Sequence, residues 1–167
     1  MKPDIITIIG KSNSGKTTLM EKLITVLSQK GYKIGSVKHA HEGFEMDKKG
    51  KDSWRHKHAG ASATLVIAPG KTALIKDDDT DHIKRICTHL SDMDLVLAEG
   101  FKSLDLPKIE VFRKDGGHKT PLALNNAFLI AFVTDTGHAP KVPVFMPDDI
   151  PGIAAFLETR YLTQADL

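Results

Sequence analysis

The segment from Gly10 to Thr17 is the first part of the sequence whose residue types and spacing could do chemistry. It reads GKSNSGKT, which matches the pattern GxxxxGK[ST] of loops that bind nucleotide phosphates. Glycines let such a loop curl until several backbone N–H groups point at one phosphate, and the helix that follows adds its positive N-terminal dipole. Lys16 would neutralise charge on the transferring phosphate, and the Thr17 hydroxyl would be a ligand for Mg²⁺.

A nucleotide site also needs a carboxylate for the metal at the end of a nearby strand. Residues 94–100, DLVLAEG, place two carboxylates around one short apolar run. Ligands of open α/β sheets bind at the carboxyl ends of strands, so we expect Glu99 to bind the metal or to position water, with Asp94 at the opposite end. Lys16 and Glu99 are therefore the predicted catalytic residues. A surface acid that caps a turn stays the alternative for Glu99.

Thr134 and Asp135 follow another predicted strand, residues 128–133. An aspartate at this place can accept the N1–H and the 2-amino group of guanine, whereas adenine has neither donor. Two charge-assisted hydrogen bonds of ~1.5–3 kcal/mol each would favour guanine by roughly two to four decades. The lysine of the familiar guanine motif Asn-Lys-x-Asp is missing, so a turn former before Gly137 stays the alternative for Asp135.

Two His-x-His pairs lie in the polar stretch between residues 38 and 58. His39 and His41 would share one face of a strand and could chelate a metal, whereas His56 and His58 would diverge on a helix. The surrounding cations favour a pocket for an anion or a substrate, and a solvated polar loop remains a third possibility. These cations are Lys38, Lys51, Arg55 and Lys57.

The elements that must position these residues follow from short β-branched runs and from helical spacing of apolar residues. Strands and helices alternate, which predicts an α/β protein with three layers: a mostly parallel sheet with helices on both faces. Residues 4–38 form its first βαβ unit, and residues 39–58 form a functional loop plus a short helix. Strands are expected at residues 4–9, 33–38, 63–68, 72–76, 95–98, 108–112, 128–133 and 142–146, and helices at residues 17–29, 80–90 and 153–161.

Length and composition limit the class of protein. The 167 residues suit one domain that spans residues 1–167. A net charge of 23 minus 21, or +2, excludes a general binder of nucleic acid or of membrane surfaces. The single Cys87 excludes an internal disulfide and a cysteine-rich zinc module. We expect neither a signal peptide nor a span of about 20 apolar residues that could cross a bilayer, which together predict a cytoplasmic protein.

Several segments resemble the molybdopterin-guanine dinucleotide biosynthesis protein B (MobB) family. They are KHAHEGFEMDKKGKDSWRHKHAGA at residues 38–61 and EGFKSLDLPKIEVFR at residues 99–113, in the same order as the phosphate loop and Thr134-Asp135. The resemblance extends to about Pro151. It implies a P-loop fold and a homodimer that binds GTP with weak GTPase activity. Such a protein assists the guanylyltransferase enzyme that joins a guanine nucleotide to molybdopterin.

The resemblance also implies roles for single residues, with GTP and Mg²⁺ as cofactors and molybdopterin as a further ligand. Molybdopterin carries a phosphate and a dithiolene, both anionic, so a basic lining suits it. The implied nucleotide-binding residues are Gly10, Ser12, Asn13, Ser14, Gly15, Lys16, Thr17, Thr18, Thr134 and Asp135. The implied metal residues are Thr17, Asp47 and Glu99. From the basic chemistry of the middle segment we further infer an anion or substrate pocket at His39, His41, Arg55 and Lys102.

Three other functions remain open: a P-loop small-molecule kinase, a carrier or adaptor without catalysis, and a GTP-dependent metal-insertion protein. The scattered arginines lack the Arg-rich lid of small kinases. Arg55 or Arg113 could serve as an arginine finger, and without one hydrolysis should be slow. Lys11 could reach the nucleotide of a second subunit, as in dimeric ATPases with a deviant P-loop. Residues 63–76 and 108–112 are candidates for strand pairing between subunits.

Overall fold

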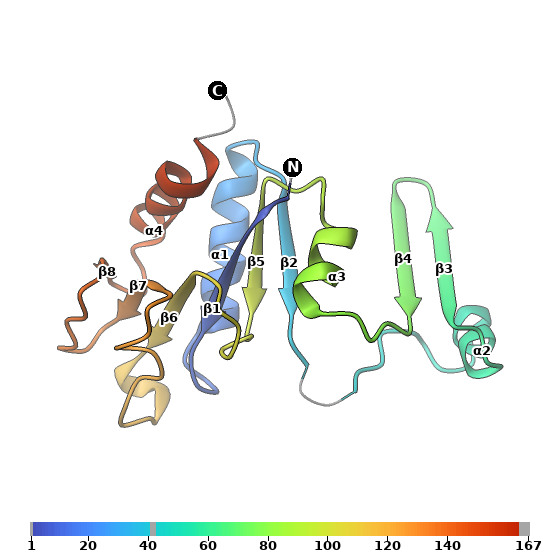
Figure 1. Ribbon diagram of the computed structural model, residues 1–167, viewed down its shortest axis with the longest axis horizontal. Helices are drawn as coiled ribbons and strands as arrows, with labels where there is room; N and C mark the ends of the chain where they lie inside the picture. The colour runs from blue at the N-terminus through green and yellow to red at the C-terminus, as the bar shows by residue number, and fades with distance from the viewer. Residues whose placement is uncertain (1, 41–42, 164–167) are drawn as a thin grey trace. The chain divides into compact units, whose positions relative to one another are not determined.

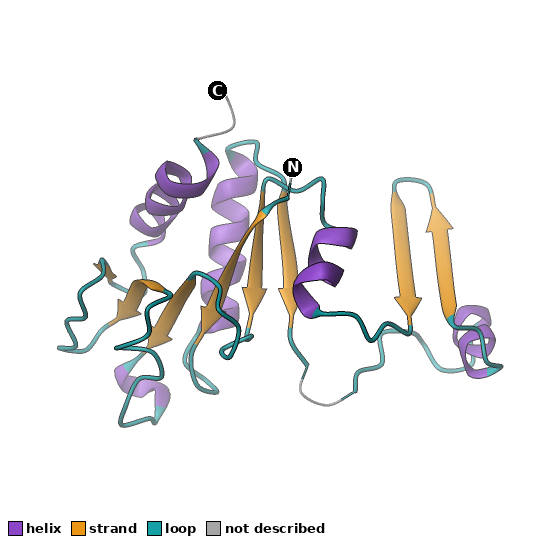
Figure 2. Cartoon of the chain, in the orientation of Figure 1, coloured by secondary structure: helices purple, strands orange, loops and turns teal. Residues whose placement is uncertain are grey.

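The computed structural model describes residues 2–40 and 43–163, which divide into two compact units. The first unit combines the described residues of Met1–His39 and Ile86–Leu167, and the second those of Ala40–Arg85. Figure 1 shows the path of the chain through its helices and strands, and Figure 2 shows the same chain by type of element. The single nucleotide-binding domain expected from the sequence stays a prediction.

A six-stranded sheet forms the centre of the first unit. All neighbouring strands run parallel in the order β2-β5-β1-β6-β7-β8, so their carboxyl ends meet at one edge. The predicted strands are confirmed with small shifts at their ends. Their bounds are β1 (Asp4–Ile9), β2 (Ile34–Lys38), β5 (Leu95–Glu99), β6 (Lys108–Phe112), β7 (Leu129–Thr134) and β8 (Val144–Phe145).

The strand order adds two findings to the sequence prediction. β1 and β2 are not neighbours, because β5 lies between them and pairs with both. The apolar residues of β5 are buried, which suits a central strand, whereas β2 is partly exposed and lies at the edge. The suggestion that residues 108–112 pair with a second subunit is wrong, because β6 already pairs with β1 on one side and β7 on the other.

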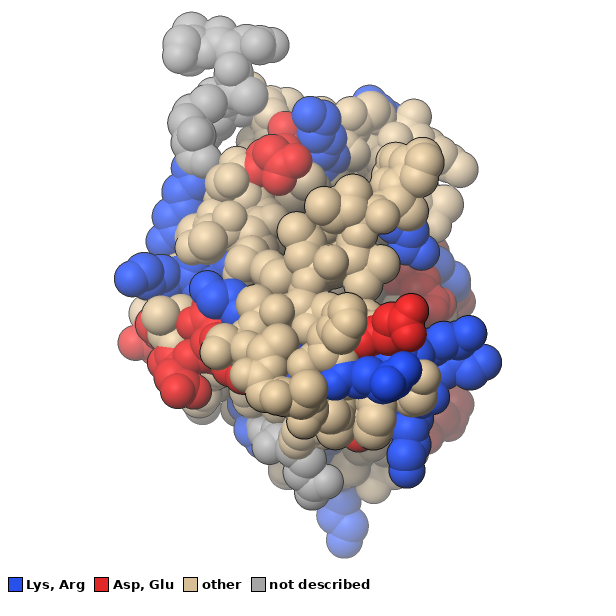
Figure 3. Space-filling view, turned by 90° about the vertical axis from the view of Figure 1, so that its right-hand side faces the viewer, with Lys and Arg blue, Asp and Glu red and all other residues tan. Residues whose placement is uncertain are grey.

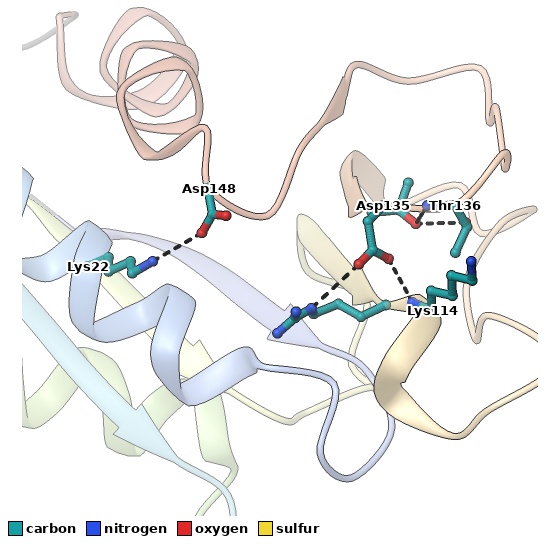
Figure 4. A network of polar contacts seen from close by, with 7 residues as sticks. Lys22, Lys114, Asp135, Thr136 and Asp148 are labelled. Atoms are coloured by element: carbon teal, nitrogen blue, oxygen red, sulfur yellow. Dashed lines mark hydrogen bonds and ion pairs between the residues drawn. The ribbon is translucent and has the colours of Figure 1, made fainter.

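Helices cover both faces of the sheet, which confirms the predicted α/β fold. α1 (Lys16–Gln29) and α4 (Ile150–Leu157) contact each other and share one hydrophobic core with one face of the sheet. Lys22 of α1 pairs with Asp148 just before α4 at 3.3 Å (Figure 4). On the opposite face, Leu90 packs over Gly35, directly after α3 (His82–His89). α4 begins three residues earlier than predicted, and a π-helix (Glu158–Leu162) continues it.

The second unit contains α2 (Asp52–His58) and a hairpin of two antiparallel strands. These strands, β3 (Ala63–Ala68) and β4 (Lys71–Lys76), were both expected from the sequence, as was a short helix before them. In the space-filling view of Figure 3, residues other than Lys, Arg, Asp and Glu run up the middle of the surface. Most hairpin side chains are exposed, including the apolar Leu65, Val66, Ile67 and Leu74.

No helix of residues 2–40 and 43–163 is both long enough and apolar enough to cross a membrane.

Candidate functional site

The phosphate loop connects β1 to α1 at the carboxyl edge of the sheet. The loop folds back on itself: the Ser14 N–H donates to the Lys11 carbonyl at 3.3 Å, and the Lys16 ammonium donates to the same carbonyl at 2.8 Å. α1 follows directly, with the Leu19 N–H donating to the Gly15 carbonyl. The positive end of the α1 dipole therefore lies at the loop, as the motif predicts.

The loop backbone has a shape that only certain residues tolerate. Gly10 and Gly15 have φ of 150° and 94°, and Asn13 has φ of 60°, a region that asparagine enters more readily than most residues. A Cβ at Gly10 would lie 2.5 Å from both the Ser14 hydroxyl and the Val111 carbonyl. The Ser14 hydroxyl is buried without a hydrogen-bond partner among the described residues, so it remains able to donate to a phosphate oxygen.

Thr17 and Glu99 form the metal side of the candidate site. Glu99 ends β5, which pairs with β1, and its two carboxylate oxygens lie 3.2 and 3.1 Å from the Thr17 hydroxyl. A hydroxyl and a carboxylate are oxygen ligands of the kind Mg²⁺ prefers, so these residues fit that ion. Asp94 lies at the opposite end of β5, where it accepts the Lys33 N–H at 2.7 Å, as expected. Thr18 follows Thr17 in the exposed first turn of α1.

Asp135 lies on the other side of the phosphate loop, directly after β7. Its Oδ1 accepts the backbone N–H of Lys114 at 2.7 Å, and its Oδ2 lies 3.8 Å from Nε of Arg113 (Figure 4). Both oxygens of this carboxylate therefore already face donors of the chain. Arg113 directly follows β6, the strand beside β1 on the side away from β5. The sequence did not predict this pairing of Asp135 with residues 113–114.

A second polar chain begins at Thr134, the last residue of β7. Its hydroxyl accepts the Thr136 N–H at 3.1 Å and lies 2.8 Å from the Thr136 hydroxyl. The Thr136 hydroxyl in turn lies 2.7 Å from Nδ1 of His138, whose ring packs edge-on against Phe112. Thr134 therefore fixes the turn after β7, where the sequence places a nucleotide-binding residue.

The four residues predicted to line an anion or substrate pocket are distributed over different parts of the chain. His39 follows β2 in the first unit, where its N–H donates to the Glu99 carbonyl at 3.0 Å and its ring lies 4.8 Å from the ring of Phe101. Lys102 is exposed in the same unit. Arg55 lies in α2 of the second unit, and His41 lies outside the described residues. The shared pocket stays a prediction.

The remaining candidate metal ligands belong to the second unit. One oxygen of Asp47 accepts the Lys48 N–H at 2.8 Å, and the other is buried without a hydrogen-bond partner among the described residues. His58 stacks on Trp54 at 3.6 Å between ring centroids, and its Nδ1 lies 2.9 Å from the Trp54 carbonyl. Within residues 2–40 and 43–163, no three His, Cys, Asp or Glu residues cluster closely enough to hold a metal ion.

β6 also contains two charged residues whose side chains are buried. Glu110 is 1% exposed and accepts the N–H groups of Leu122 and Ala123. Lys108 is also 1% exposed, and its ammonium donates to the Leu104 carbonyl at 2.6 Å. Burial lowers the pKa of Lys108, and the charge of Asp105 opposes that shift. The alternation of charged and apolar residues in KIEVF is the sequence signal for this face of β6.

Comparisons with known proteins agree with this arrangement. The sequence model of the family MobB, described as molybdopterin guanine dinucleotide synthesis protein B, matches residues 5–135. The chain is 34% identical over 158 residues to the molybdopterin-guanine dinucleotide biosynthesis adapter protein of Escherichia coli K12, covering 92% of this chain and 90% of that protein. It is also 34% identical over 158 residues to the protein of the same name from Haemophilus influenzae, with coverage of 92% and 87%.

A solved structure supports the same relationship at the level of the fold. The crystal structure of Bacillus subtilis MobB superposes with a TM-score of 0.74 and 28% identity, covering 93% of this chain and 96% of that one. Because the family model matches well over half of the chain and the Escherichia coli relative is 34% identical over 92% of it, this protein belongs to the MobB family.

Proposed function

We propose that this protein is an adapter in molybdopterin-guanine dinucleotide biosynthesis that binds GTP with Mg²⁺ at its phosphate loop. Membership of the MobB family supports the adapter role. The observation that carries the nucleotide site is the contact of Thr17 with Glu99, at 3.2 and 3.1 Å, directly beside the curled loop. This contact unites a hydroxyl from α1 and a carboxylate from β5 at the place where a metal-bound phosphate would lie.

Several residues of the loop would contact the phosphate chain. Backbone N–H groups and the buried Ser14 hydroxyl would donate to phosphate oxygens. The Lys16 ammonium has three donors and uses one on the Lys11 carbonyl, so it can also contact phosphate. Thr17 and Glu99 would hold Mg²⁺, which when bound supplies positive charge against the phosphates. Asp47 as a further metal residue remains a proposal from the family resemblance.

We expect hydrolysis to be slow. Glu99 is the carboxylate beside Thr17, and a carboxylate that holds a metal is a poor base for water. Slow hydrolysis suits an adapter that responds to whether GTP is bound and does not depend on the products of hydrolysis. The guanine preference, the partner guanylyltransferase and the contact with molybdopterin rest on the family resemblance and belong to the same proposal.

The exposed hairpin supports a homodimer as part of this proposal. A two-stranded sheet is marginally stable in water by itself, and both faces of β3 and β4 carry exposed apolar side chains. Ile67 is 71% exposed and is the most exposed of them. We expect Ile67→Lys to convert a dimer into a monomer by light scattering after gel filtration, whereas Glu21→Lys on exposed α1 should not. A wild-type monomer would contradict the dimer.

Calorimetric titration tests the nucleotide site directly. GTP and ATP analogues are titrated with Mg²⁺ into wild-type protein and into Lys16→Ala, with Lys2→Ala as a matched lysine control outside the loop. We expect tight GTP binding that the Lys16 variant loses and the control retains. Equal affinity of Lys16→Ala and wild type would refute the site, and transfer of phosphate to a small acceptor would identify a kinase instead.

The adapter role needs a separate assay with purified partner. The wild-type protein and Lys16→Ala are mixed with the purified guanylyltransferase of molybdenum cofactor synthesis, with GTP analogue, with GDP and without nucleotide. We expect the wild type to bind the enzyme with an affinity that depends on the nucleotide, and the Lys16 variant to lose that dependence. No binding under any of these conditions would contradict the adapter role.

A further inference from the structure

Arg113 lies against the phosphate loop from the side of β6. A Cβ on Gly15 would lie 3.5 Å from Cδ of Arg113 and 3.7 Å from its Nη1. The loop follows β1, which pairs with β5 on one side and β6 on the other. Because Glu99 ends β5 and Arg113 follows β6, the two side chains flank the loop on opposite sides. The loop therefore has a carboxylate on its metal side and a guanidinium on the other.

Asp135 forms an ion pair with this guanidinium. Its Oδ2 lies 3.8 Å from Nε of Arg113, while its Oδ1 is fixed by the 2.7 Å hydrogen bond from the Lys114 N–H. Nε of Arg113 is buried and has no hydrogen-bond partner among the described residues. The Arg113 side chain as a whole is 43% exposed, so the head can reach solvent and a ligand. The carboxylate therefore lies beside the buried Nε, while the rest of the partly exposed side chain is accessible to a ligand.

We propose that Arg113 binds the phosphate chain of the nucleotide and that Asp135 is the positioning residue that holds Arg113 there, rather than the group that reads guanine. This inference rests on the proposed function. A planar guanidinium with five N–H donors suits phosphate oxygens and is always charged. Because Arg113 lies against Gly15 of the phosphate loop, which would bind diphosphates and triphosphates alike, we expect it to act on the binding of both. An arginine finger would instead act on the rate of hydrolysis.

The two roles of Asp135 predict different effects of Asp135→Asn on selectivity between bases. The asparagine carbonyl still accepts the Lys114 N–H, but the side chain no longer carries a charge for Arg113. If Asp135 read guanine, its amide would favour xanthine, which has a carbonyl where guanine has its 2-amino group. If Asp135 positions Arg113, every phosphate ligand loses affinity by the same factor and xanthine gains nothing.

The experiment measures dissociation constants with Mg²⁺ for GDP, a GTP analogue, xanthosine triphosphate and inorganic tripolyphosphate, which has no base. We expect Arg113→Ala to weaken GDP, the GTP analogue and tripolyphosphate by a similar factor of about 10 to 100. Arg113→Lys should recover part of the loss, since it keeps the charge. Asp135→Asn should weaken the same ligands, and in the Arg113→Ala background it should add nothing further. Arg160→Ala, beyond α4, is the matched control and should bind like wild type.

Several results would overturn the inference. One is an Asp135→Asn variant that loses guanine nucleotides but gains xanthosine triphosphate. Another is an Arg113→Ala variant whose affinities are unchanged, whether or not its hydrolysis is slower. Lys16→Ala separates this inference from the proposed function. If wild type binds no nucleotide, or Lys16→Ala binds like wild type, the proposed function fails. If only Lys16→Ala loses binding, the inference about Arg113 fails alone.

Discussion

The Thr17 hydroxyl lies 3.2 and 3.1 Å from the two carboxylate oxygens of Glu99, a residue 82 positions farther along the chain. Parallel pairing of β1 with β5 brings them together, because Ile8 and Glu99 are partners in register. The chain then turns sharply at Gly100, with φ of 95°, and its N–H donates to the Ile8 carbonyl. Strand pairing and the turn at Gly100 therefore form the side of the site that we propose binds Mg²⁺.

Removal of the Thr17 hydroxyl tests this metal side. Without Mg²⁺, we expect Thr17→Ala to bind GTP as tightly as wild type does. With Mg²⁺, we expect its affinity for GTP to be about tenfold lower than that of wild type, since a metal ligand is absent. Thr17→Ser keeps the hydroxyl and serves as the control. The measurement is calorimetry with and without Mg²⁺. Equal Mg²⁺ dependence in Thr17→Ala and wild type would exclude this residue from the metal site.

Gly10 tests the shape of the phosphate loop. A Cβ at this position would lie 2.5 Å from the Val111 carbonyl and from the Ser14 hydroxyl. Because the backbone of β6 cannot move aside easily, we expect Gly10→Ala to lower the free energy of unfolding by roughly 1–3 kcal/mol and to weaken GTP binding. Gly43→Ala, which has no neighbour within 4 Å, should be close to neutral. Urea denaturation measures both, and an unchanged Gly10→Ala would contradict the close approach.

Glu110 tests the buried anchor on β6. Its carboxylate accepts the N–H groups of Leu122 and Ala123 in a position that is 1% exposed. Glu110→Ala leaves both donors without an acceptor, so we expect a loss of about 3 kcal/mol in the free energy of unfolding. Glu110→Gln keeps one acceptor oxygen and should lose about 1 kcal/mol. Chemical denaturation gives both values, with the exposed Glu21→Ala as control. Similar stability of Glu110→Ala and Glu21→Ala would disprove the anchor.

The buried Lys108 predicts a dependence of stability on alkaline pH. Burial lowers the pKa of Lys108 below 10.5, so the folded protein binds fewer protons than the unfolded chain between the lowered pKa and 10.5. The contribution of Lys108 to the free energy of unfolding therefore rises with pH across that interval. Burial raises the pKa of Tyr161 above 10.0, so the folded protein binds more protons than the unfolded chain between 10.0 and the raised pKa. The contribution of Tyr161 to the free energy of unfolding therefore falls as pH rises across that interval.

Lys108→Met separates the two effects. The methionine fills a similar volume without the ammonium, so we expect it to remove the rise in stability that Lys108 contributes below pH 10.5 and to leave the contribution of Tyr161 unchanged. Tyr161→Phe is the complementary variant. The free energies of unfolding are compared at pH 7 and pH 10 by urea denaturation. If the difference between wild type and Lys108→Met is the same at both values, Lys108 does not titrate as its burial requires.

The strands show how far local sequence could predict the fold. The run DIITII predicts β1 and LVLA predicts most of β5, because continuous β-branched and apolar residues suit strands buried on both faces. Neither run says which strand lies beside which. The insertion of β5 between β1 and β2, and the two-sided pairing of β6, depend on contacts between segments that are distant in the chain.

The candidate site shows the same division between local and distant information. Spacing alone predicts the phosphate loop from Gly10 to Thr17, because its glycines, lysine and hydroxyl act within one turn of backbone. Position after a strand also predicts Glu99 at the correct edge. The pairing of Asp135 with Arg113 and Lys114 could not be predicted, since β6 and β7 bring these residues together only after the sheet has formed.

The sequence by itself determined the class of the elements, the phosphate loop and the family resemblance, because hydrophobic period and motif spacing are local properties. Only the tertiary structure decided which side chains face the loop from each side. It places Glu99 and Arg113 on opposite flanks, through the neighbours of β1, and gives Asp135 an arginine and a backbone N–H as partners. The physical reason is that parallel pairing aligns the carboxyl ends of strands whose order the local sequence does not encode.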